Sequence, residues 1–221
     1  NDCGAKTIIS SEDKIQALAD IREHTRIENI ISFGKMENGI KSFHSLVTEN
    51  LSIERELNVY PKDLSTIAYT SGTTGHPKGA MQSHEAVILN GSMMSQLHMR
   101  GSDDIVVSAL PCPHVYANVL MTGMMMFGTK LVLHKTFEVE AIFEAIKIHK
   151  ATIFDGVPTM YMFMLNSSTL EKSDLSSLKR CYVGGQTMPV ATMAAVEKEF
   201  KVPLIELWGM TEIAGLGATF P

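Results

Sequence analysis

The sequence predicts an α/β fold with a mostly parallel sheet flanked by helices. Short runs of β-branched residues alternate with longer runs of helical periodicity, which is the pattern of strand–helix–strand units. Loops rich in Gly, Pro, Thr and His come directly after several of the predicted strands. With 45% hydrophobic residues and a mean hydropathy of +0.08, the 221-residue chain can bury a sizeable core.

The regular alternation begins at Ser65, so we divide the chain there. Residues 1–64 are expected to form a partial N-terminal part of the α/β domain plus an irregular connection. Residues 65–221 are expected to form the α/β subdomain that carries the site. The first part has predicted strands at 7–10 and 29–33, a helix between them with Ile15, Leu18, Ala19 and Ile21 on one face, and a short helix near 44–48.

In the second part the predicted strands and helices follow one another with short connections. The strands are expected at 66–70, 105–109, 130–133, 152–154, 180–183 and 203–207. The helices are expected at 85–97, 115–127, 139–149, 159–165 and 190–200. Ligands of an open parallel sheet bind outside the carboxyl ends of its strands. Five loops are therefore expected to meet at one edge: 71–79, 111–114, 155–158, 184–186 and 208–212.

Charge and cysteine content exclude several classes of protein. Lys and Arg number 19 against 24 Asp and Glu, a net charge of −5 that argues against nucleic acid or an anionic membrane as the main partner. Cys3, Cys112 and Cys181 lie far apart, which suits the cytoplasm better than a disulfide framework or a zinc site. The most apolar stretch, 115–127, contains Asn118 and is too short for a membrane span.

The segment from Thr70 to Gly79 has the composition of a phosphate-binding loop. Three glycines allow backbone N–H groups to approach an anion, the hydroxyls of Ser71, Thr73 and Thr74 add donors, and Lys78 adds a cation. It is not a Walker A loop, because Lys78 is followed by Gly79 and not by a hydroxyl residue. A flexible surface turn is the alternative, and the combination of residues after an apolar strand makes it the weaker one.

A second group of polar residues follows the strand predicted at 203–207. Trp208 can stack on a purine, Thr211 can donate to a phosphate, and Glu212 can hold magnesium through hard oxygen ligands. A core tryptophan beside an exposed Thr-Glu pair is the alternative. Gly184 and Gly185 let the backbone lie against a flat ring, although such a pair alone is more often a plain turn.

These segments together resemble the adenylate-forming superfamily, which includes acyl-CoA synthetases, luciferases and peptide-synthetase adenylation domains. The similarity runs in order through the loop 70–79, Ser83-His84, 111–114, 156–159, 184–185 and 209–212, most of the chain from about Leu64 to Pro221. The order of the motifs makes a chance match untenable.

The resemblance implies a role for each motif residue. The expected ATP-binding residues are Thr70, Ser71, Gly72, Thr73, Thr74, Gly75, Lys78, Gly184, Gly185, Gln186, Trp208, Gly209, Met210 and Thr211. The expected catalytic residues are His114, Thr211, Glu212 and Lys78, with Glu212 as the metal ligand. The sequence departs from the family in having Trp208 where tyrosine is usual, Cys112-Pro113 before His114, and Ala117 where glycine is common.

By resemblance, the chain is expected to activate a carboxylic acid, most plausibly a fatty acid, to an acyl-adenylate and then to a thioester. The implied cofactors and substrates are ATP, magnesium and coenzyme A. An aspartate that binds a substrate ammonium in amino-acid-activating relatives has no counterpart near His114, which favours an acid without an amino group. An adenylation domain that loads a carrier protein is one alternative, and a catalytically silent nucleotide-binding module is another.

The chain begins with Asn1, not Met, and we interpret it as a fragment. Relatives carry, beyond the position of Pro221, an aspartate that grips the ribose and a C-terminal domain with a catalytic lysine. The 221 residues alone are therefore expected to be inactive, and the surfaces that would meet further segments favour self-association of the fragment.

Overall fold

The computed structural model describes residues 2–15, 18, 23–34, 39–49, 56–71 and 75–220. The chain divides into two compact units, Asn1–Val59 and Tyr60–Pro221. Sequence analysis had placed a division between 64 and 65.

The first unit contains a small parallel sheet of order β1-β2-β3. Its elements are β1 (Thr7–Ser10), β2 (Asn29–Ser32), β3 (Lys41–Ser42) and α2 (Phe43–Glu49). The short strand β3 was not expected in this polar stretch. Of the helix predicted after β1, Ile15 and Leu18 lie in described helical turns, whereas Ala19 and Ile21 lie outside the described residues.

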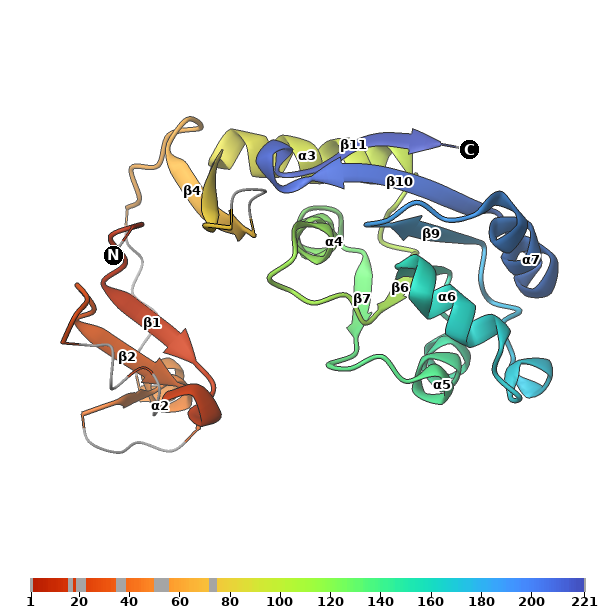
Figure 1. The fold of residues 1–221 in the computed structure, drawn as a ribbon, viewed down its shortest axis with the longest axis horizontal. Coiled ribbons are helices and arrows are strands. Elements are labelled where there is room, and N and C mark those ends of the chain that lie inside the picture. The colour runs from red at the N-terminus through yellow and green to blue at the C-terminus, as the bar shows by residue number, and fades with distance from the viewer. Residues whose placement is uncertain are drawn as a thin grey trace. The chain divides into compact units, whose positions relative to one another are not determined.

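The second unit is built on a six-stranded sheet of order β11-β10-β9-β8-β6-β7 (Figure 1). Its strands are β6 (Ile105–Ser108), β7 (Lys130–Leu133), β8 (Ile153–Gly156), β9 (Arg180–Gly184), β10 (Leu204–Met210) and β11 (Gly215–Phe220). Every neighbouring pair is parallel except β10 and β11. Parallel neighbours need a crossover, and a helix supplies each one. The expected mostly parallel sheet with flanking helices is therefore confirmed.

The helices of the second unit are α3 (His84–Leu97), α4 (Val115–Phe127), α5 (Val139–His149), α6 (Pro158–Leu165) and α7 (Val190–Phe200). Figure 1 shows α5, α6 and α7 together on one side of β6, β9 and β10, with α4 on the other side. Helix α3 packs against α4 and β11. No helix within the described ranges combines the length and the apolar character that a bilayer crossing requires.

Strand alternation divides the core into two layers. Val107, Phe154 and Cys181 are fully buried in the layer that includes Ile142 and Ile146 of α5. The alternate residues of the same strands, among them Val106 and Tyr182, form a second cluster that includes Tyr116 of α4. The second layer also holds polar side chains, and these lie next to the candidate site described below.

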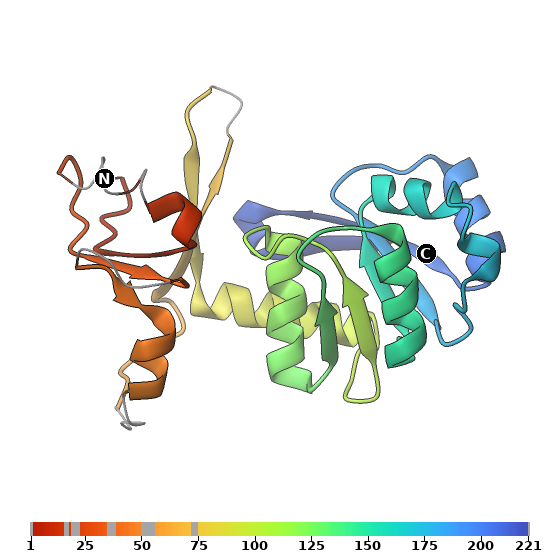
Figure 2. The same cartoon turned by 90° about the horizontal axis from the view of Figure 1, so that it is seen from below.

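The phosphate-loop segment belongs to a hairpin and not to the parallel sheet. Strands β4 (Leu64–Thr70) and β5 (Lys78–Ser83) pair only with each other and are antiparallel. Figure 2 shows them side by side, with β5 running directly into α3. The expectation that residues 71–79 all form a loop is wrong for Lys78 and Gly79, which lie in β5. Strand β5 reads KGAMQS and has no β-branched residue, so its sequence gives little strand signal.

Three other predicted loops are also partly strand, and Gly184, expected in one of them, ends β9. β10 continues through Trp208, Gly209 and Met210, because β11 returns antiparallel beside it and supplies hydrogen-bond partners. Asp155 and Gly156, expected in a loop, end β8.

We expect core packing on α5 to carry much of the stability of the second unit. Ile146→Ala should lower the free energy of unfolding by about 2–5 kcal/mol, because Ile146 is fully buried and truncation leaves a cavity. Ile148→Ala is the matched control on the same helix, where the side chain is 63% exposed, and should change stability by less than about 0.5 kcal/mol. Urea unfolding of both variants measures the difference, and equal losses would contradict this assignment of the buried face.

Candidate functional site

A pocket of about 50 Å³ lies beside the carboxyl ends of β9 and β10. Apart from His114 and Tyr116, whose rings carry polar atoms, the residues that line it are apolar or glycine. The lining residues are Met94, His114, Val115, Tyr116, Val119, Gly184, Gly185, Leu207, Gly209, Gly215 and Leu216. Four residues that sequence analysis assigned to the site, from three different loops or strands, therefore meet here.

A wider hollow of about 330 Å³ adjoins this pocket. It is lined by Gly185, Gln186, Thr187, Glu206, Leu207, Trp208, Gly209 and Phe220. Gly185, Leu207 and Gly209 line both spaces, so the pocket and the hollow share one wall. Gln186 and Trp208, both expected to contact ATP, lie on the hollow side of that wall.

The shared wall depends on glycine. A Cβ at Gly209 would collide with the carbonyl oxygen of Gly215, so β10 and β11 could not approach as they do. A Cβ at Gly184 would lie 3.2 Å from both the Leu207 carbonyl oxygen and Tyr116 Cε1. Gly185 has φ +87°, which other residues rarely adopt. The wall is therefore mostly backbone, and a flat ligand can approach it closely.

His114 caps the N-terminus of α4 at the mouth of the pocket. Its Nδ1 accepts a hydrogen bond from the Tyr116 backbone N–H at 3.2 Å. A neutral histidine that accepts at Nδ1 carries its proton on Nε2. The exposed His114 ring can therefore donate a hydrogen bond from Nε2 to an anionic oxygen.

Trp208 lines the hollow with its indole partly exposed. A Cβ at Gly217 would lie 2.7 Å from Trp208 Cε3, so the indole rests against the backbone of β11. The indole is covered only in part, because Trp208 is 53% exposed to solvent. An indole held in this way is a stacking surface for a planar base.

The segment with Thr211 and Glu212 is a short 3₁₀ turn, η2 (Thr211–Ile213), tied to two other elements. Gln82 of β5 donates to the Thr211 carbonyl oxygen at 2.6 Å. Asn90 of α3 donates to the Ile213 and Leu216 carbonyl oxygens at 3.2 and 2.8 Å and accepts from the Leu216 N–H at 2.9 Å. These bonds join the hairpin of the expected phosphate loop to Thr211 and Glu212, both accessible to solvent.

The hairpin brings the ends of the expected phosphate loop together. Thr70 pairs with Lys78 in the last register position of β4 and β5. Ser71, Gly75 and Lys78 are exposed, and Gly75 has φ +81°. Gly72, Thr73 and Thr74 lie outside the described residues. Met210, also expected to contact ATP, ends β10 immediately before η2.

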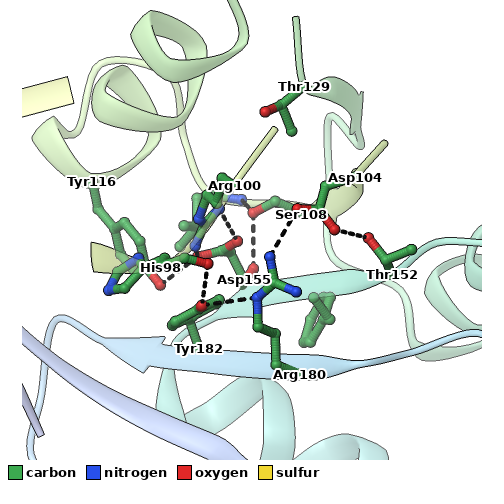
Figure 3. Close-up of polar contacts among 12 residues, drawn as sticks. His98, Arg100, Asp104, Ser108, Tyr116, Thr129, Thr152, Asp155, Arg180 and Tyr182 are labelled. Atoms are coloured by element: carbon green, nitrogen blue, oxygen red, sulfur yellow. Dashed lines mark hydrogen bonds and ion pairs between the residues drawn. The ribbon is translucent and has the colours of Figure 1, made fainter. Parts of the chain in front are cut away.

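Sequence analysis missed a buried polar cluster next to the pocket (Figure 3). Arg100 and Asp155 form a bidentate ion pair, with Nη1–Oδ2 at 2.8 Å and Nη2–Oδ1 at 2.9 Å. The Tyr116 hydroxyl donates to Asp155 Oδ1 at 2.9 Å. The Arg100 guanidinium lies 4.4 Å from the centre of the Tyr182 ring, which stacks on His98 at 4.2 Å. An aspartate in the otherwise apolar run 152–156 was the available signal.

The cluster continues to the rim of the sheet. Arg180 donates to Asp104 Oδ2 at 2.8 Å and to the Tyr182 hydroxyl at 3.0 Å. Thr152 donates to Asp104 Oδ1 at 2.7 Å. His98 Nε2 lies 3.1 Å from Thr219 Oγ1 of β11. The two ion pairs thus join β8 and β9 to the segment between α3 and β6.

Burial sets the protonation states in this cluster. Burial, followed by the charge of Arg100, lowers the pKa of His98 to about 4, so the ring is neutral. Burial would lower the pKa of Arg100, but Asp155 beside it holds that pKa above its ordinary value. Burial and the Asp155 charge raise the pKa of Tyr116 well above its usual range, so its hydroxyl remains a donor. The Tyr116–Asp155–Arg100 bonds therefore persist across neutral pH.

Residues 1–221 of the chain match a protein-family model described as "AMP-binding enzyme". Among curated proteins, indoleacetate–CoA ligase of Aromatoleum aromaticum is 31% identical over 91% of this chain and 38% of its own length. The long-chain-fatty-acid–CoA ligase of Bacillus subtilis is 32% identical over 82% of this chain and 33% of its own length. This chain therefore spans well under half the length of these relatives.

Solved structures show the same fold. A long-chain-fatty-acid–CoA ligase from Archaeoglobus fulgidus is 26% identical, with a TM-score of 0.88 over 100% of this chain and 46% of that one. The anthranilate CoA ligase AuaEII, in complex with anthranoyl-AMP, is 23% identical, with a TM-score of 0.90 over 99% of this chain and 43% of that one. The second likeness supports the fold alone.

The neutral state of His98 predicts a pH dependence of stability. Its pKa is about 4 in the folded chain and near 6.5 when unfolded, so the unfolded state binds more protons between these values. Stability should therefore fall as pH falls from about 6.5 towards 4, with about 2 kcal/mol lost to this group by pH 5. Arg100, Asp155 and Arg180 are the charged groups that act on the ring.

His98→Gln should remove this component, so the stability difference between variant and wild type should shrink by about 2 kcal/mol between pH 7.5 and pH 5. Denaturant unfolding at both values measures it. His44→Gln, at an exposed position on α2, is the control and should leave the pH profile close to that of the wild type. A difference that stays constant with pH would show that His98 is not a buried neutral histidine.

Proposed function

Because this chain belongs to the AMP-binding enzyme family, we propose that it carries the acyl and nucleotide sites of an acid–CoA ligase. Such an enzyme activates a carboxylic acid with ATP and passes the acyl group to coenzyme A. The observation that carries the proposal is the shared wall at Gly185 and Gly209, with an apolar pocket on one side and the Trp208 hollow on the other. The two substrates of an adenylation reaction need adjoining sites of these two kinds.

The apolar pocket is proposed to hold the acyl part of the acid. Met94, Val119 and Leu216 offer hydrocarbon surface, and among the lining residues there is no carboxylate to pair with a substrate ammonium. This favours an acid without an amino group. The lining suits a fatty acyl group, as named for one relative, and equally the ring of an arylacetic acid, as named for another.

The hollow is proposed to hold the adenine of ATP. The base would stack on the open side of Trp208 and lie against the backbone of Gly184 and Gly185. Gln186 supplies an amide for its edge, and Met210 leads the chain from this wall to Thr211. The phosphates would then extend towards Thr211, Lys78 and the loop after Thr70.

The chemistry of the proposed first step is displacement at phosphorus. A carboxylate oxygen attacks the α-phosphorus of ATP, the bond to the bridging oxygen breaks, and pyrophosphate leaves with the electron pair. Charge builds on the α-phosphate oxygens, which the Thr211 hydroxyl and His114 Nε2–H can stabilise by donating hydrogen bonds. Lys78 with Ser71, Gly72, Thr73, Thr74 and Gly75 would hold the departing pyrophosphate. A thiol then displaces AMP from the acyl carbon.

Glu212 fits a magnesium ligand by the chemistry of its donor. Its carboxylate is exposed on η2, and magnesium typically binds one or two protein carboxylates together with substrate phosphates. Among the described residues, no group of three or more His, Cys, Asp or Glu side chains lies together as a metal site, and a phosphate-assisted ion does not need one. When bound, the ion would neutralise charge on the phosphates.

Coenzyme A is proposed as the acceptor in preference to a carrier protein, because both relatives are named as CoA ligases. We place the reaction in the cytoplasm. Cys3, Cys112 and Cys181 are all free thiols, which is what a reducing compartment maintains.

Acid-driven ATP–pyrophosphate exchange by the full-length protein tests the proposal, and Lys78 is its first probe. Lys78→Ala should lower kcat/KM for ATP by roughly 10–100-fold, since one charge-assisted contact contributes about 1.5–3 kcal/mol. Lys198→Ala, at an exposed position on α7, is the matched control. Wild-type exchange kinetics in Lys78→Ala would remove this residue from the phosphate site.

Glu212→Gln should abolish most exchange activity and raise the magnesium concentration needed for what remains, because the amide keeps the shape but not the charge. Glu199→Gln, on the exposed side of α7, is the control and should behave like the wild type. The measurement is exchange rate against magnesium concentration. Full activity of Glu212→Gln at ordinary magnesium would exclude Glu212 as the ligand.

A further inference from the structure

Tyr116 is where the apolar pocket and the buried polar cluster meet. Its ring lines the pocket, and its hydroxyl donates to Asp155 Oδ1 at 2.9 Å (Figure 3). The ring edge packs closely against β9, where a Cβ at Gly184 would lie 3.2 Å from Tyr116 Cε1. Its backbone N–H also donates to His114 Nδ1. One residue thus forms a wall of the pocket and orients the histidine at its mouth.

Asp155, the partner of the Tyr116 hydroxyl, is held in place by further hydrogen bonds. The Asp155 carboxylate is 0% exposed and receives two hydrogen bonds from Arg100 and one from Tyr116. Arg100 is held in turn between this carboxylate and the face of the Tyr182 ring. A buried carboxylate that loses a donor has no water to replace it, so the tyrosine hydroxyl is strongly retained.

We infer that the buried Arg100–Asp155 pair positions Tyr116 as the inner wall of the acyl pocket and thereby restricts the enzyme to compact acids. This inference rests on the proposed function. Arg100 and Asp155 are positioning residues, since they act through Tyr116. Compact means an acyl group that ends at the phenol ring, which lines the pocket.

Long acyl chains are excluded in two ways. The phenol ring blocks the route inward, and the space behind it is occupied by an ion pair. An alkyl chain that displaced the ring would have to lie against a carboxylate and a guanidinium whose hydrogen bonds it had broken. If the residues behind the ring were apolar, an alkyl chain could displace the ring without breaking hydrogen bonds. The charged pair therefore makes the wall selective against long chains as well as rigid.

The test measures acid-driven ATP–pyrophosphate exchange by the full-length protein with straight-chain acids of increasing length. The wild type should prefer short acids, with kcat/KM falling steeply beyond them. Tyr116→Phe keeps the ring but frees it from Asp155, and should raise kcat/KM for the longer acids at least 10-fold relative to the shortest efficient one. The gain should come from the KM for the acid, with the KM for ATP unchanged.

A second variant keeps the tyrosine and removes what holds it. Arg100→Met with Asp155→Leu replaces the buried pair by apolar groups of similar size, a change that buried ion pairs often tolerate. It should relax the length preference in the same direction. Tyr161→Phe is the matched control, because its hydroxyl is also buried and donates to the Phe154 and Tyr182 carbonyl oxygens but does not line the pocket. It should leave the length profile unchanged.

The outcomes separate the inference from the function on which it rests. A wild-type preference for long acids, or an unchanged profile in both Tyr116→Phe and the double variant, would overturn the inference and leave the ligase function standing. Equal relaxation by Tyr161→Phe would do the same, because it would show a general effect of loosening the fold. Absence of exchange with every acid would overturn both.

Discussion

The ion pair between Arg100 and Asp155 is the constraint on which one whole layer of the sheet depends. Apolar side chains can repack in several ways, but a bidentate pair of carboxylate and guanidinium strongly restricts how its two side chains can lie. Asp155 sits at the end of β8, between Ser108 of β6 and Tyr182 of β9. Arg100 comes from the turn after α3, so the pair fixes where that helix ends relative to the sheet. The hydroxyl of Tyr116 adds the start of α4 to the same arrangement.

Asn90 is a second polar anchor. It holds the backbone beside the proposed nucleotide site, as the ion pair holds Tyr116 beside the proposed acyl pocket. Asn90 of α3 makes three hydrogen bonds to the backbone between η2 and β11. Gly215 permits this closeness, since a Cβ there would collide with Asn90 and with Val119 of α4. Helix α3 therefore begins at the hairpin of the expected phosphate loop, holds the Thr211–Glu212 turn at its centre, and ends at the buried pair. The geometry of both proposed substrate sites is therefore set along one helix.

The sequence predicted those features that depend on local pattern. Helices α4, α5 and α7 and strand β7 have the expected limits, because each has a clear apolar period or run. Strand β5, the end of β10 and the place of Asp155 were not predicted, since each depends on a partner distant in the chain. Asp155 before a glycine resembles a turn, but its pairing with Ser108 of β6 and Tyr182 of β9 makes it a strand residue. Three of the five loops proposed for the site, 111–114, 184–186 and 208–212, contribute residues to two adjoining spaces. The importance of Tyr116 could not be inferred, because a tyrosine in an apolar helix signals only core packing.

The glycine wall determines which groups can bind the proposed substrates and which can stabilise charge. A wall of backbone at Gly185 and Gly209 would let the two proposed substrates approach closely but offers no side chain to the reacting atoms. The groups that could stabilise charge must therefore stand at the rim, where His114 and Thr211 are found. Other groups must fix the orientation of these side chains. Tyr116 does so for His114: its backbone N–H donates to the imidazole, and its own hydroxyl is held by the buried pair. The proposed selectivity for the acid and the orientation of the histidine would thus share one structural origin.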